Sequence, residues 1–382
     1  MDRRNFLKSI PAAAAMVSAG CFLAGAEPKK QNRPLSASQD IRLRMMESAI
    51  HAPSSHNSQP WLVALAPDGS IDLYVDRQRL LPMSDPPARQ IHISHGAFLE
   101  LLAMTAGELG YAANITYFPL GQYGNETVAD VPVARVVLKA DSRAVHDPLF
   151  RFSPARHTSK QPFEVARICS GEQLRTIVKA GTSTATTAAV FTETSQRRRL
   201  AEICTEAMRI EVASRLRNAE TAEWFRFSDA ELDRKRDGFG LRSNGTIGLK
   251  KWIAETFLLS RARAVDPRGA FATGAVDGAH EQASTAAAFG GISTPNNGRS
   301  DQVLAGQAYL RTHLAATSMG LQMQPMSQVL EEYAEMQVLK QQFKAELGIA
   351  KEHTVQMLFR LGYAQSNSPT PRRDVHDLLR RS

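Results

Sequence analysis

The spacing of apolar residues divides the chain into helices and strands from residue 38 onward. Apolar side chains at helical spacing predict helices over 38–50 and 91–109. Alternating apolar and polar residues predict a strand at 71–75, and an apolar run at 61–66 precedes it. Because the turn sequence Pro67-Asp68-Gly69 joins these two runs, we expect a β-hairpin.

Further segments of both kinds follow, so the pattern predicts an α+β fold. Strands are expected at 114–118 and 133–139, and a helix at 193–216. The stretch 220–298 has no sustained period and is expected to be irregular. Ser36 or Ser38 is the expected N-cap of the first helix.

Composition and charge narrow the choice of partners. At 382 residues and 43% hydrophobic, the chain can bury a large core. Its formal charge of +8 comes from 46 Lys and Arg against 38 Asp and Glu, spread in short clusters such as Arg197-Arg198-Arg199. Because there is no long basic tract and aromatic residues make up only 7%, a small anionic ligand is expected and nucleic acid is not.

Residues 1–26 have the features of an export signal. Arg3-Arg4 with Phe6 and Leu7, followed by the apolar run 10–24, resembles a twin-arginine signal; a Sec signal or N-terminal anchor is the alternative. We expect export to the periplasm or cell envelope. The twin-arginine route carries folded proteins, which suits a protein that acquires a cofactor in the cytoplasm.

The processing of this signal has two interpretations. Ala24-Gly25-Ala26 is a small-x-small sequence, and cleavage near Ala26 is expected. A lipid on Cys21, with membrane attachment, is the alternative, although Ser18 is a poor match to a lipobox.

Common catalytic and metal-binding motifs are absent from the sequence. Cys169 and Cys204 lack CxxC or Cys/His ligand spacing, so both are expected to be core residues and no metal site is expected. There is no GxSxG, no Walker A loop and no GxGxxG that opens a helix.

Two polar segments are the candidate binding elements. Residues 52–61 lie between a predicted helix and strand, and Pro53 and Pro60 predict a stiff extended loop. Its side chains that can face a polar ligand are Ser54, Ser55, Asn57 and Gln59. A capped turn is the alternative.

The second segment is 154–163. In an extended conformation its Arg156, Thr158 and Lys160 would share one side and could hold a phosphate or a polarised carbonyl. A solvated basic loop is the alternative.

Both segments resemble motifs of the nitroreductase family. Residues 52–61 resemble the loop that holds FMN in this family, and 156–160 resemble its Arg-x-Ser-x-Arg/Lys motif. Their order is reversed and they lie far apart, as in the Acg branch. The resemblance therefore implies a nitroreductase-like fold of two fused halves, 36–150 and 151–382, forming an internal pseudo-dimer that is monomeric and holds one FMN between the halves.

Later segments resemble the same family. The resemblance implies a helix at 172–180, after the second segment. Residues 305–319 are similar to the central helix of the family, 321–328 to the turn beside the flavin ring, 354–360 to the last core strand, and 369–375 to the C-terminal phosphate motif. Ser327 stands where many reductases have Glu, a departure that affects the chemistry at N5. In the Acg branch a lid covers the flavin, and we expect it within 220–298.

The resemblance implies a role for each matching residue. Arg156, Thr158 and Arg373, with Arg372 beside them, would bind the FMN phosphate, and Lys160 would lie near N1 and O2. Ser54, Ser55 and Asn57 would contact the ribityl chain and ring, with Gln59 in the same loop. The backbone of Met326, Ser327 and Gln328 would face N5 and O4. No catalytic side chain is expected, because hydride transfer belongs to the flavin.

Three functions are compatible with these features. The first is an FMN-dependent oxidoreductase that passes hydride to small nitro, quinone or enone-like acceptors. The second is a flavin-sequestering or storage protein with a covered FMN and little NAD(P)H turnover. The third, an exported solute-binding protein, requires the motif matches to be coincidental.

Overall fold

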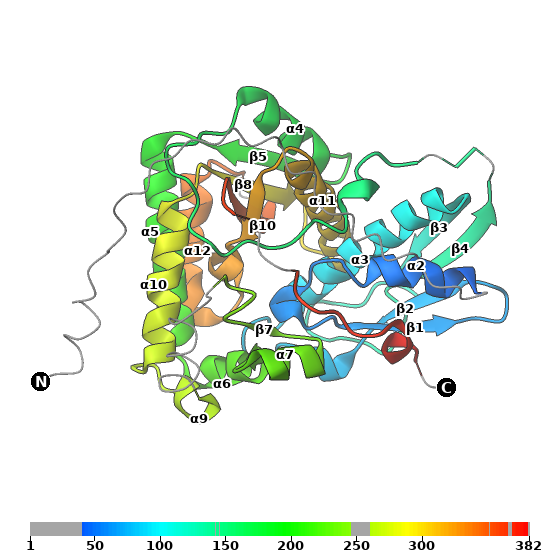
Figure 1. The fold of residues 1–382 in the computed structure, drawn as a ribbon, viewed down its shortest axis with the longest axis horizontal. Helices are drawn as coiled ribbons and strands as arrows, with labels where there is room; N and C mark the ends of the chain where they lie inside the picture. Colours follow the sequence, from blue (N-terminus) through cyan, green and yellow to red (C-terminus); the bar gives the residue numbers. More distant parts are fainter. Residues whose placement is uncertain are drawn as a thin grey trace, which may run out of the picture. The chain divides into compact units, whose positions relative to one another are not determined.

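The computed structural model contains two four-stranded sheets, both antiparallel and with matching strand order (Figure 1). The structure describes residues 40–380 except 142, 145, 246–259, 351 and 366–368, so the expected signal at 1–26 lies outside the described residues. The first sheet has the order β1-β2-β4-β3 and the second β5-β8-β10-β9. Helices and antiparallel sheets together confirm the α+β class.

The first sheet consists of β1 (Trp61–Leu65), β2 (Ile71–Val75), β3 (Tyr111–Tyr117) and β4 (Ala134–Ala140). The second consists of β5 (Thr187–Phe191), β8 (Ala288–Thr294), β9 (Gln322–Pro325) and β10 (Thr354–Gly362). A short parallel pair joins β6 (Phe225–Arg226) and β7 (Phe239–Gly240). The helices are α2 (Ile41–Ala49), α3 (Arg89–Glu108), α4 (Gly171–Gly181), α5 (Thr194–Val212), α6 (Arg215–Trp224), α7 (Asp229–Lys235), α9 (Arg261–Ala264), α10 (Ala270–Ser284), α11 (Arg299–Ser318) and α12 (Gln337–Glu346).

Most predicted elements are present, with several corrections. The hairpin β1-β2 is confirmed, and so are α2, α3, α4, β4 and β10 within a few residues. Asp40, and neither predicted serine, caps α2, because its side chain accepts from the Arg42 N–H at 2.9 Å. The predicted helix 193–216 is two helices, since Ser214 caps a new one, α6. The helix predicted at 305–319 begins at Arg299.

The stretch predicted to be irregular contains regular structure. Within 220–298 the described residues form α10, which packs against α5, and β8, a central strand of the second sheet (Figure 1). The strand was missed because Gly290 and Gly291 lie in its middle. Glycine is required at 290, since a Cβ there would lie 2.3 Å from the ring of Phe359. The segment 192–287 is thus an insertion between strands β5 and β8, the counterparts of the hairpin strands β1 and β2.

Helices α3 and α11 join the two sheets. Each lies between the second and third strands of its sheet along the chain and begins with a fully buried arginine, Arg89 or Arg299. They cross at Gly96 and Gly306, which occupy the same position in the two helices. A Cβ on Gly96 would lie 1.8 Å from the Val303 carbonyl oxygen, and one on Gly306 would lie 1.9 Å from that of Ile93. The two backbones are therefore in direct contact.

The tail, residues 369–380, follows β10 of the second sheet but packs on the first. Val375 and Leu378 belong to the core formed by α2, α3 and the first sheet. The Arg380 N–H donates to the Val63 carbonyl at 2.8 Å, so the tail pairs with the edge of β1. The chain after β10 thus completes the core beside the first sheet.

A buried acidic cluster lies at the N-terminus of α3. Arg89 donates to the carbonyls of Gln356 (2.7 Å) and Leu330 (3.1 Å) in the second half. Asp85, only 3% exposed, accepts from the Ile91 N–H at 3.1 Å. Burial raises the pKa of Asp85 to about 6 although Arg89 opposes the shift. The carboxyl of Glu331, which is also buried, has its pKa raised by burial and by Asp85.

The raised pKa of Asp85 predicts a stability that falls as pH rises. The folded state holds this proton more tightly than the unfolded state, so the stabilisation is complete below the ordinary aspartate pKa of 3.8 and is lost as pH rises through about 6. The shift corresponds to about 3 kcal/mol. Urea unfolding of wild type and Asp85→Asn at pH 4.5, 6 and 7.5 should show the difference in free energy of unfolding between them change by an amount of this order.

Asp68→Asn is the control for this prediction. The pKa of Asp68 is lowered by its hydrogen bonds from Ser70, so its contribution is lost as pH falls, which is the opposite sign. Parallel pH profiles for wild type and Asp85→Asn would contradict the prediction.

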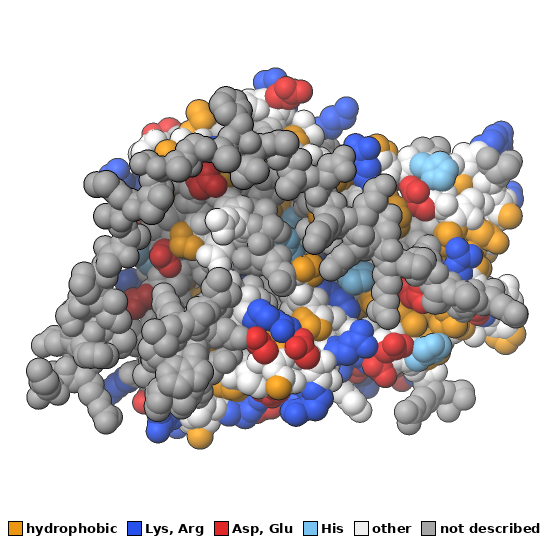
Figure 2. All heavy atoms as spheres, viewed as in Figure 1, with side chains coloured by type: hydrophobic (Ala, Val, Ile, Leu, Met, Phe, Trp, Pro, Cys, Tyr) orange, Lys and Arg blue, Asp and Glu red, His pale blue; other side chains and the backbone are white. Residues whose placement is uncertain are grey.

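The visible surface carries mixed charge. Figure 2 shows basic and acidic side chains beside one another on this face. Ion pairs between such residues include those of Arg242 with Asp229 and Asp233. No helix among the described residues is both long enough and apolar enough to cross a membrane.

Candidate functional site

The loop 52–61 is a tight turn where an extended loop was predicted. Residues Ser55–Asn57 form a short 3-10 turn, and His56, Asn57 and Gln59 have positive φ. The turn closes because the Ser54 hydroxyl accepts from the Gln59 N–H at 3.0 Å. The Ser55 N–H in turn donates to the hydroxyl of Ser94 on α3 at 3.2 Å. Gln59, which precedes Pro60, has a φ of 50° and is not extended, so local hydrogen bonds decide the conformation between the prolines.

The segment 156–161 runs beside β9. Thr158 forms a parallel bridge with Met323, and the Ser159 N–H donates to the Met323 carbonyl at 3.3 Å. Lys160 is half-buried, with its ammonium 4.5 Å from the centre of the Phe239 ring. The centres of the His56 and Phe239 rings are 5.5 Å apart. Lys160 thus meets the candidate loop through a residue of the insertion.

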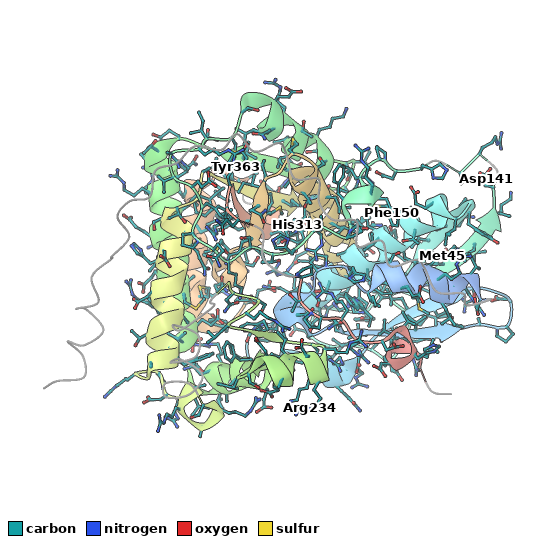
Figure 3. The ribbon with its side chains drawn as sticks, viewed as in Figure 1. Met45, Asp141, Phe150, Arg234, His313 and Tyr363 are labelled. Carbon is teal, nitrogen blue, oxygen red and sulfur yellow. The ribbon has the colours of Figure 1, made fainter. Side chains whose placement is uncertain are left out.

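Arg156 reaches the candidate loop directly. Only 5% exposed, it donates to the His51 carbonyl at 3.0 Å and to His313 Nδ1 at 3.3 Å. His313 of α11, labelled in Figure 3, can accept there because its Nε2 faces the His157 carbonyl at 3.0 Å. Burial and Arg156 keep the pKa of His313 well below its usual value, so the imidazole is neutral. The contact does not neutralise Arg156.

Arg372 brings a second cation to the same place. Burial, together with the charge of Arg156, lowers the pKa of Arg372 to about 9. Burial likewise lowers the pKa of Arg156 to about 10. Guanidinium groups nevertheless remain charged at neutral pH. Among the described residues neither arginine has a carboxylate partner, so this region holds two adjacent, uncompensated positive charges.

Arg373 has a different environment. Its Nη1 lies 3.6 Å from a carboxylate oxygen of Asp76 and donates to the Gln59 carbonyl at 3.1 Å, and its Nη2 donates to the Asp377 carbonyl. The Arg373 N–H also donates to Gln59 Oε1 at 2.8 Å. Arg373 and Gln59 therefore fasten the tail to the loop, and of the two neighbouring arginines Arg372 has the freer charge.

The turn after β9 is only partly free to contact a ligand. The Met326 N–H donates to the Leu358 carbonyl at 2.8 Å, so it is occupied by the sheet. The Ser327 hydroxyl lies 3.9 Å from the sulfur of Met357. Gln328 is half-buried, and its carbonyl accepts from the Glu331 N–H at 3.1 Å.

Buried polar atoms without hydrogen-bond partners gather in the predicted segments. Such atoms are costly, and a native protein usually satisfies them with a partner, water or ligand. In the described part of the chain eleven side-chain atoms are of this kind. Five belong to the loop, the strand segment and the tail: Asn57 Oδ1, Ser58 Oγ, Arg156 Nε, Ser159 Oγ and Arg372 Nε. A sixth, the hydroxyl of Tyr309, interacts electrostatically with Arg156.

Residues 236–240 of the insertion are hydrogen-bonded to the candidate loop. Asn57 Nδ2 donates to the Gly238 carbonyl at 2.9 Å, and the Gly238 N–H donates to the Asn57 carbonyl at 3.1 Å. Gln59 Nε2 donates to the Arg236 carbonyl at 2.9 Å. The insertion therefore contacts the predicted binding loop along its polar residues.

The sequence did not reveal every residue of this region. His51, Tyr309, His313 and Phe239 lie beside the predicted residues, but each reads as an ordinary core or loop position. The contact of Asn57 with Gly238 uses backbone groups, which have no sequence signal. Helical spacing of Tyr309 and His313 on α11 is the only pattern that could have suggested a shared face.

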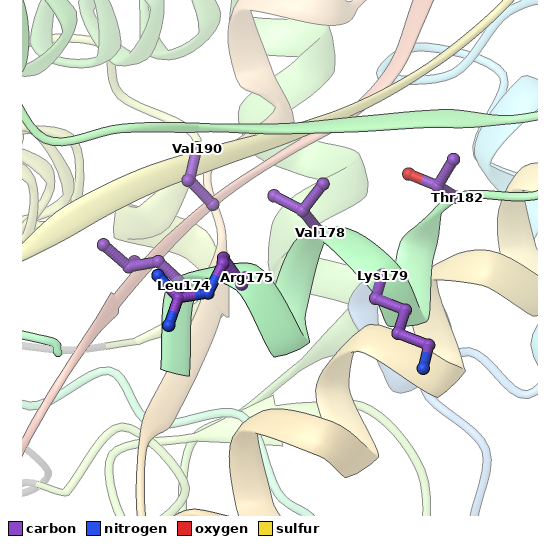
Figure 4. A pocket seen from close by; sticks show the side chains of 6 residues that line it. All are labelled: Leu174, Arg175, Val178, Lys179, Thr182 and Val190. Atoms are coloured by element: carbon purple, nitrogen blue, oxygen red, sulfur yellow. The ribbon is translucent and has the colours of Figure 1, made fainter. Parts of the chain in front are cut away.

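A cavity of about 440 Å³ lies elsewhere, between α4 and β5 (Figure 4). It is lined by Leu174, Arg175, Val178, Lys179, Thr182 and Val190. None of the predicted site residues lines it. No cluster of potential metal ligands occurs among the residues that the structure describes.

Comparisons with known proteins agree with the motif resemblance. No family model matches the chain. An uncharacterized protein of Mycobacterium tuberculosis H37Rv is 35% identical over 122 residues, which cover 30% of this chain and 33% of that protein. A protein of the same strain named putative NAD(P)H nitroreductase acg is 34% identical over 80 residues, 21% of this chain and 24% of that protein. The chain thus spans a third or less of the length of these relatives.

Solved structures with lower identity are also similar. The FMN-dependent nitroreductase NfnB of Mycobacterium smegmatis, in complex with NADPH, is 16% identical with a TM-score of 0.36, covering 61% of this chain and 96% of its own. Nitroreductase A of Vibrio parahaemolyticus is 14% identical with a TM-score of 0.32, covering 60% and 72%.

Two sequence relatives named putative NAD(P)H nitroreductases are similar to this chain over 21% and 25% of its length, in agreement with the resemblance of its motifs to the nitroreductase family. Proteins with the acg name are among these relatives, as the motif order predicted.

Proposed function

We propose that this protein is an FMN-binding, nitroreductase-like oxidoreductase that holds one FMN between its two halves. The observation that carries the proposal is the pair of cations, the buried Arg156 and the half-buried Arg372, next to polar atoms without partners on the loop, strand segment and tail. An anionic ligand would compensate both charges, and its polar groups would satisfy the atoms that lack partners.

The donor set fits FMN. A phosphate is the ligand group best matched to two guanidinium groups, and Arg156 Nε and Arg372 Nε are free donors for it. The hydroxyls of Ser58 and Ser159 and the amide oxygen of Asn57 suit the hydroxyls of a ribityl chain and the N–H and C=O groups of a flavin ring. We assign the phosphate to Arg156 and Arg372, with Thr158 nearby and Arg373 fastening the tail.

Bound FMN supplies the hydride chemistry, and this chain positions and polarises it. Lys160 has its pKa lowered to about 8 by burial, while the carboxylate of Glu211 opposes the shift. Its ammonium can therefore stabilise negative charge at the N1 and O2 edge or give up a proton near neutral pH. Ser54 and Ser55 hold the loop in shape, and the turn at Met326, Ser327 and Gln328 borders the ring. The acceptor is a small electrophile.

Matching strand order in the two sheets and the crossing of α3 and α11 support two fused nitroreductase-like halves forming an internal pseudo-dimer. The first half is 36–150 and the second 151–382. Because the loop comes from one half and the strand segment from the other, a single chain completes the site, which supports a monomer.

Anaerobic reduction tests the proposed activity. The purified protein is expected to be yellow, and NADH or NADPH should bleach the visible flavin band on a catalytic timescale if the oxidoreductase proposal is right. Dithionite is the control that reduces any accessible flavin. Absence of a flavin band after reconstitution with FMN would contradict the proposal itself.

A flavin-sequestering protein is the second candidate, because the insertion is hydrogen-bonded to the predicted loop at Asn57 and Gln59. We place the lid within 220–298 at residues 236–240. Under this proposal dithionite bleaches the flavin and nicotinamide does not. Gly238 also lies close to the Arg226 side chain and the Trp224 carbonyl. The segment is therefore held by the predicted loop on one side and by residues 224–226 on the other.

From the resemblance of residues 1–26 to a twin-arginine signal, we propose that the protein is exported to the periplasm or cell envelope. Arg3→Lys with Arg4→Lys is expected to hold the precursor in the cytoplasm, because this route requires the arginine pair. Cell fractionation and immunoblotting measure the distribution. Arg33→Lys is the matched control and should leave export unchanged; normal export of the double variant would contradict the proposal.

A further inference from the structure

Arg360 on β10 is fully buried and holds three segments together. Its Nε donates to Gln324 Oε1 at 2.7 Å, and its Nη1 donates to the Gln282 carbonyl at 2.7 Å. Its Nη2 donates to the Gln161 carbonyl at 2.6 Å and to the Ser159 carbonyl at 3.4 Å. Among the described residues it forms no ion pair, and its Nη1 also donates to the Thr285 hydroxyl at 3.3 Å, so neutral carbonyl, amide and hydroxyl oxygens satisfy this cation.

Two of these acceptors flank Lys160. In an extended chain, residues two apart present their carbonyls to the same edge, and the side chain between them projects from one face. A planar guanidinium that binds both carbonyls therefore fixes the rotation of the chain at Lys160. The bridge of Thr158 to Met323 restrains the same segment on its other side.

The segment is also held by an aromatic contact. The guanidinium carbon of Arg360 lies 3.7 Å from the centre of the Phe163 ring. Phe163 packs against Gly362, where a Cβ would lie 2.5 Å from the ring. Arg360 thus contacts the chain before and after Lys160, whose ammonium lies over the ring of Phe239.

We propose that Arg360 is a positioning residue that directs Lys160 into the flavin site. This inference rests on the proposed function for the role of Lys160. Arg360 touches no ligand: it acts through the backbone at 159 and 161, and a lysine in its place would lack the planar fork that binds two carbonyls.

A double-mutant cycle tests this role. FMN dissociation constants are measured for the wild type, Arg360→Met, Lys160→Met and the combination, below the unfolding temperature of each. Arg360→Met should weaken FMN binding at least about tenfold, equivalent to about 1.4 kcal/mol. The combination should be little weaker than Lys160→Met alone, because the effect of Arg360 passes through Lys160. If the two losses of FMN affinity multiplied in the double variant, the inference would be overturned.

Arg299→Met is the matched control. Arg299 is equally buried and donates to the carbonyls of Pro87, Asn125 and Thr127. Arg299→Met should destabilise the fold, yet its effect on FMN affinity should be the same whether residue 160 is lysine or methionine. If Arg360→Met does not fold, Arg360→Lys replaces it in the cycle, with the same expected coupling and the same overturning result.

A second readout needs no flavin. The pKa of Lys160, lowered to about 8 by burial, can be followed by NMR of labelled lysine side chains. In Arg360→Met this pKa should rise toward the usual value for lysine, and in Arg299→Met it should not. Failure of the wild type to bind FMN would contradict the proposed function, whereas an unchanged pKa of Lys160 would contradict the positioning role.

Discussion

Replacing Arg156 and Arg372 together with alanine is expected to lower FMN affinity by about two to four orders of magnitude. Each guanidinium loses a charge-assisted hydrogen bond of roughly 1.5–3 kcal/mol to the phosphate. Equilibrium titration of the apoprotein with FMN, followed by flavin fluorescence, measures the effect. Retention of wild-type affinity would contradict the placement of the phosphate.

The same variant is expected to show a second, opposite effect. Because the buried Arg156 and the half-buried Arg372 lie near each other without carboxylate partners, their removal should leave the apoprotein as stable as the wild type or more stable. Thermal unfolding without FMN measures this. Arg135→Ala with Arg380→Ala removes the same charge from ion pairs with Asp72 and Asp130, and should leave FMN affinity unchanged.

Gly96→Ala is expected to destabilise the fold by about 3 kcal/mol or more. The new Cβ would lie 1.8 Å from the Val303 carbonyl oxygen and 2.7 Å from its carbonyl carbon, so the α3 and α11 backbones must separate. Gly306→Ala should act alike, because its Cβ would meet the Ile93 carbonyl. Chemical denaturation measures the free energy of unfolding of each.

Gly274→Ala is the control for these helix glycines. Gly274 lies in α10, and a Cβ there would have no atom within 4 Å. Alanine should therefore stabilise the protein by about 0.5–1 kcal/mol, as expected for an exposed helix interior. Equal effects at Gly96 and Gly274 would contradict the direct contact of the two helices.

The sequence predicted elements whose pattern reflects one buried face. The hairpin β1-β2 and helix α3 were predicted because alternation and helical spacing are uninterrupted there. Strand β8 is buried along its whole length and has two glycines, so it shows neither alternation nor a run of β-branched residues. The break between α5 and α6 depends on a single cap at Ser214. These features depend on tertiary contacts that a local pattern does not contain.

The candidate site was predicted in part. The loop and strand segments were found because their motifs are specific, and the structure brings both to the same region. The different environments of Arg372 and Arg373 could not be predicted, since they depend on Asp76 and Gln59 far away in the chain. The role of Arg360 was also hidden, because its acceptors are mostly backbone carbonyls.

The path of the tail has a consequence for biosynthesis. The residues that surround the proposed ligand extend in chain order from Ser54 to Arg373, and the tail that carries Arg372 also covers the edge of β1. A nascent chain that has emerged only as far as β10 therefore has an unpaired sheet edge and one of the two arginines that we propose to bind the phosphate. In the proposed site we expect FMN to bind only after the tail has docked, when the fold is complete.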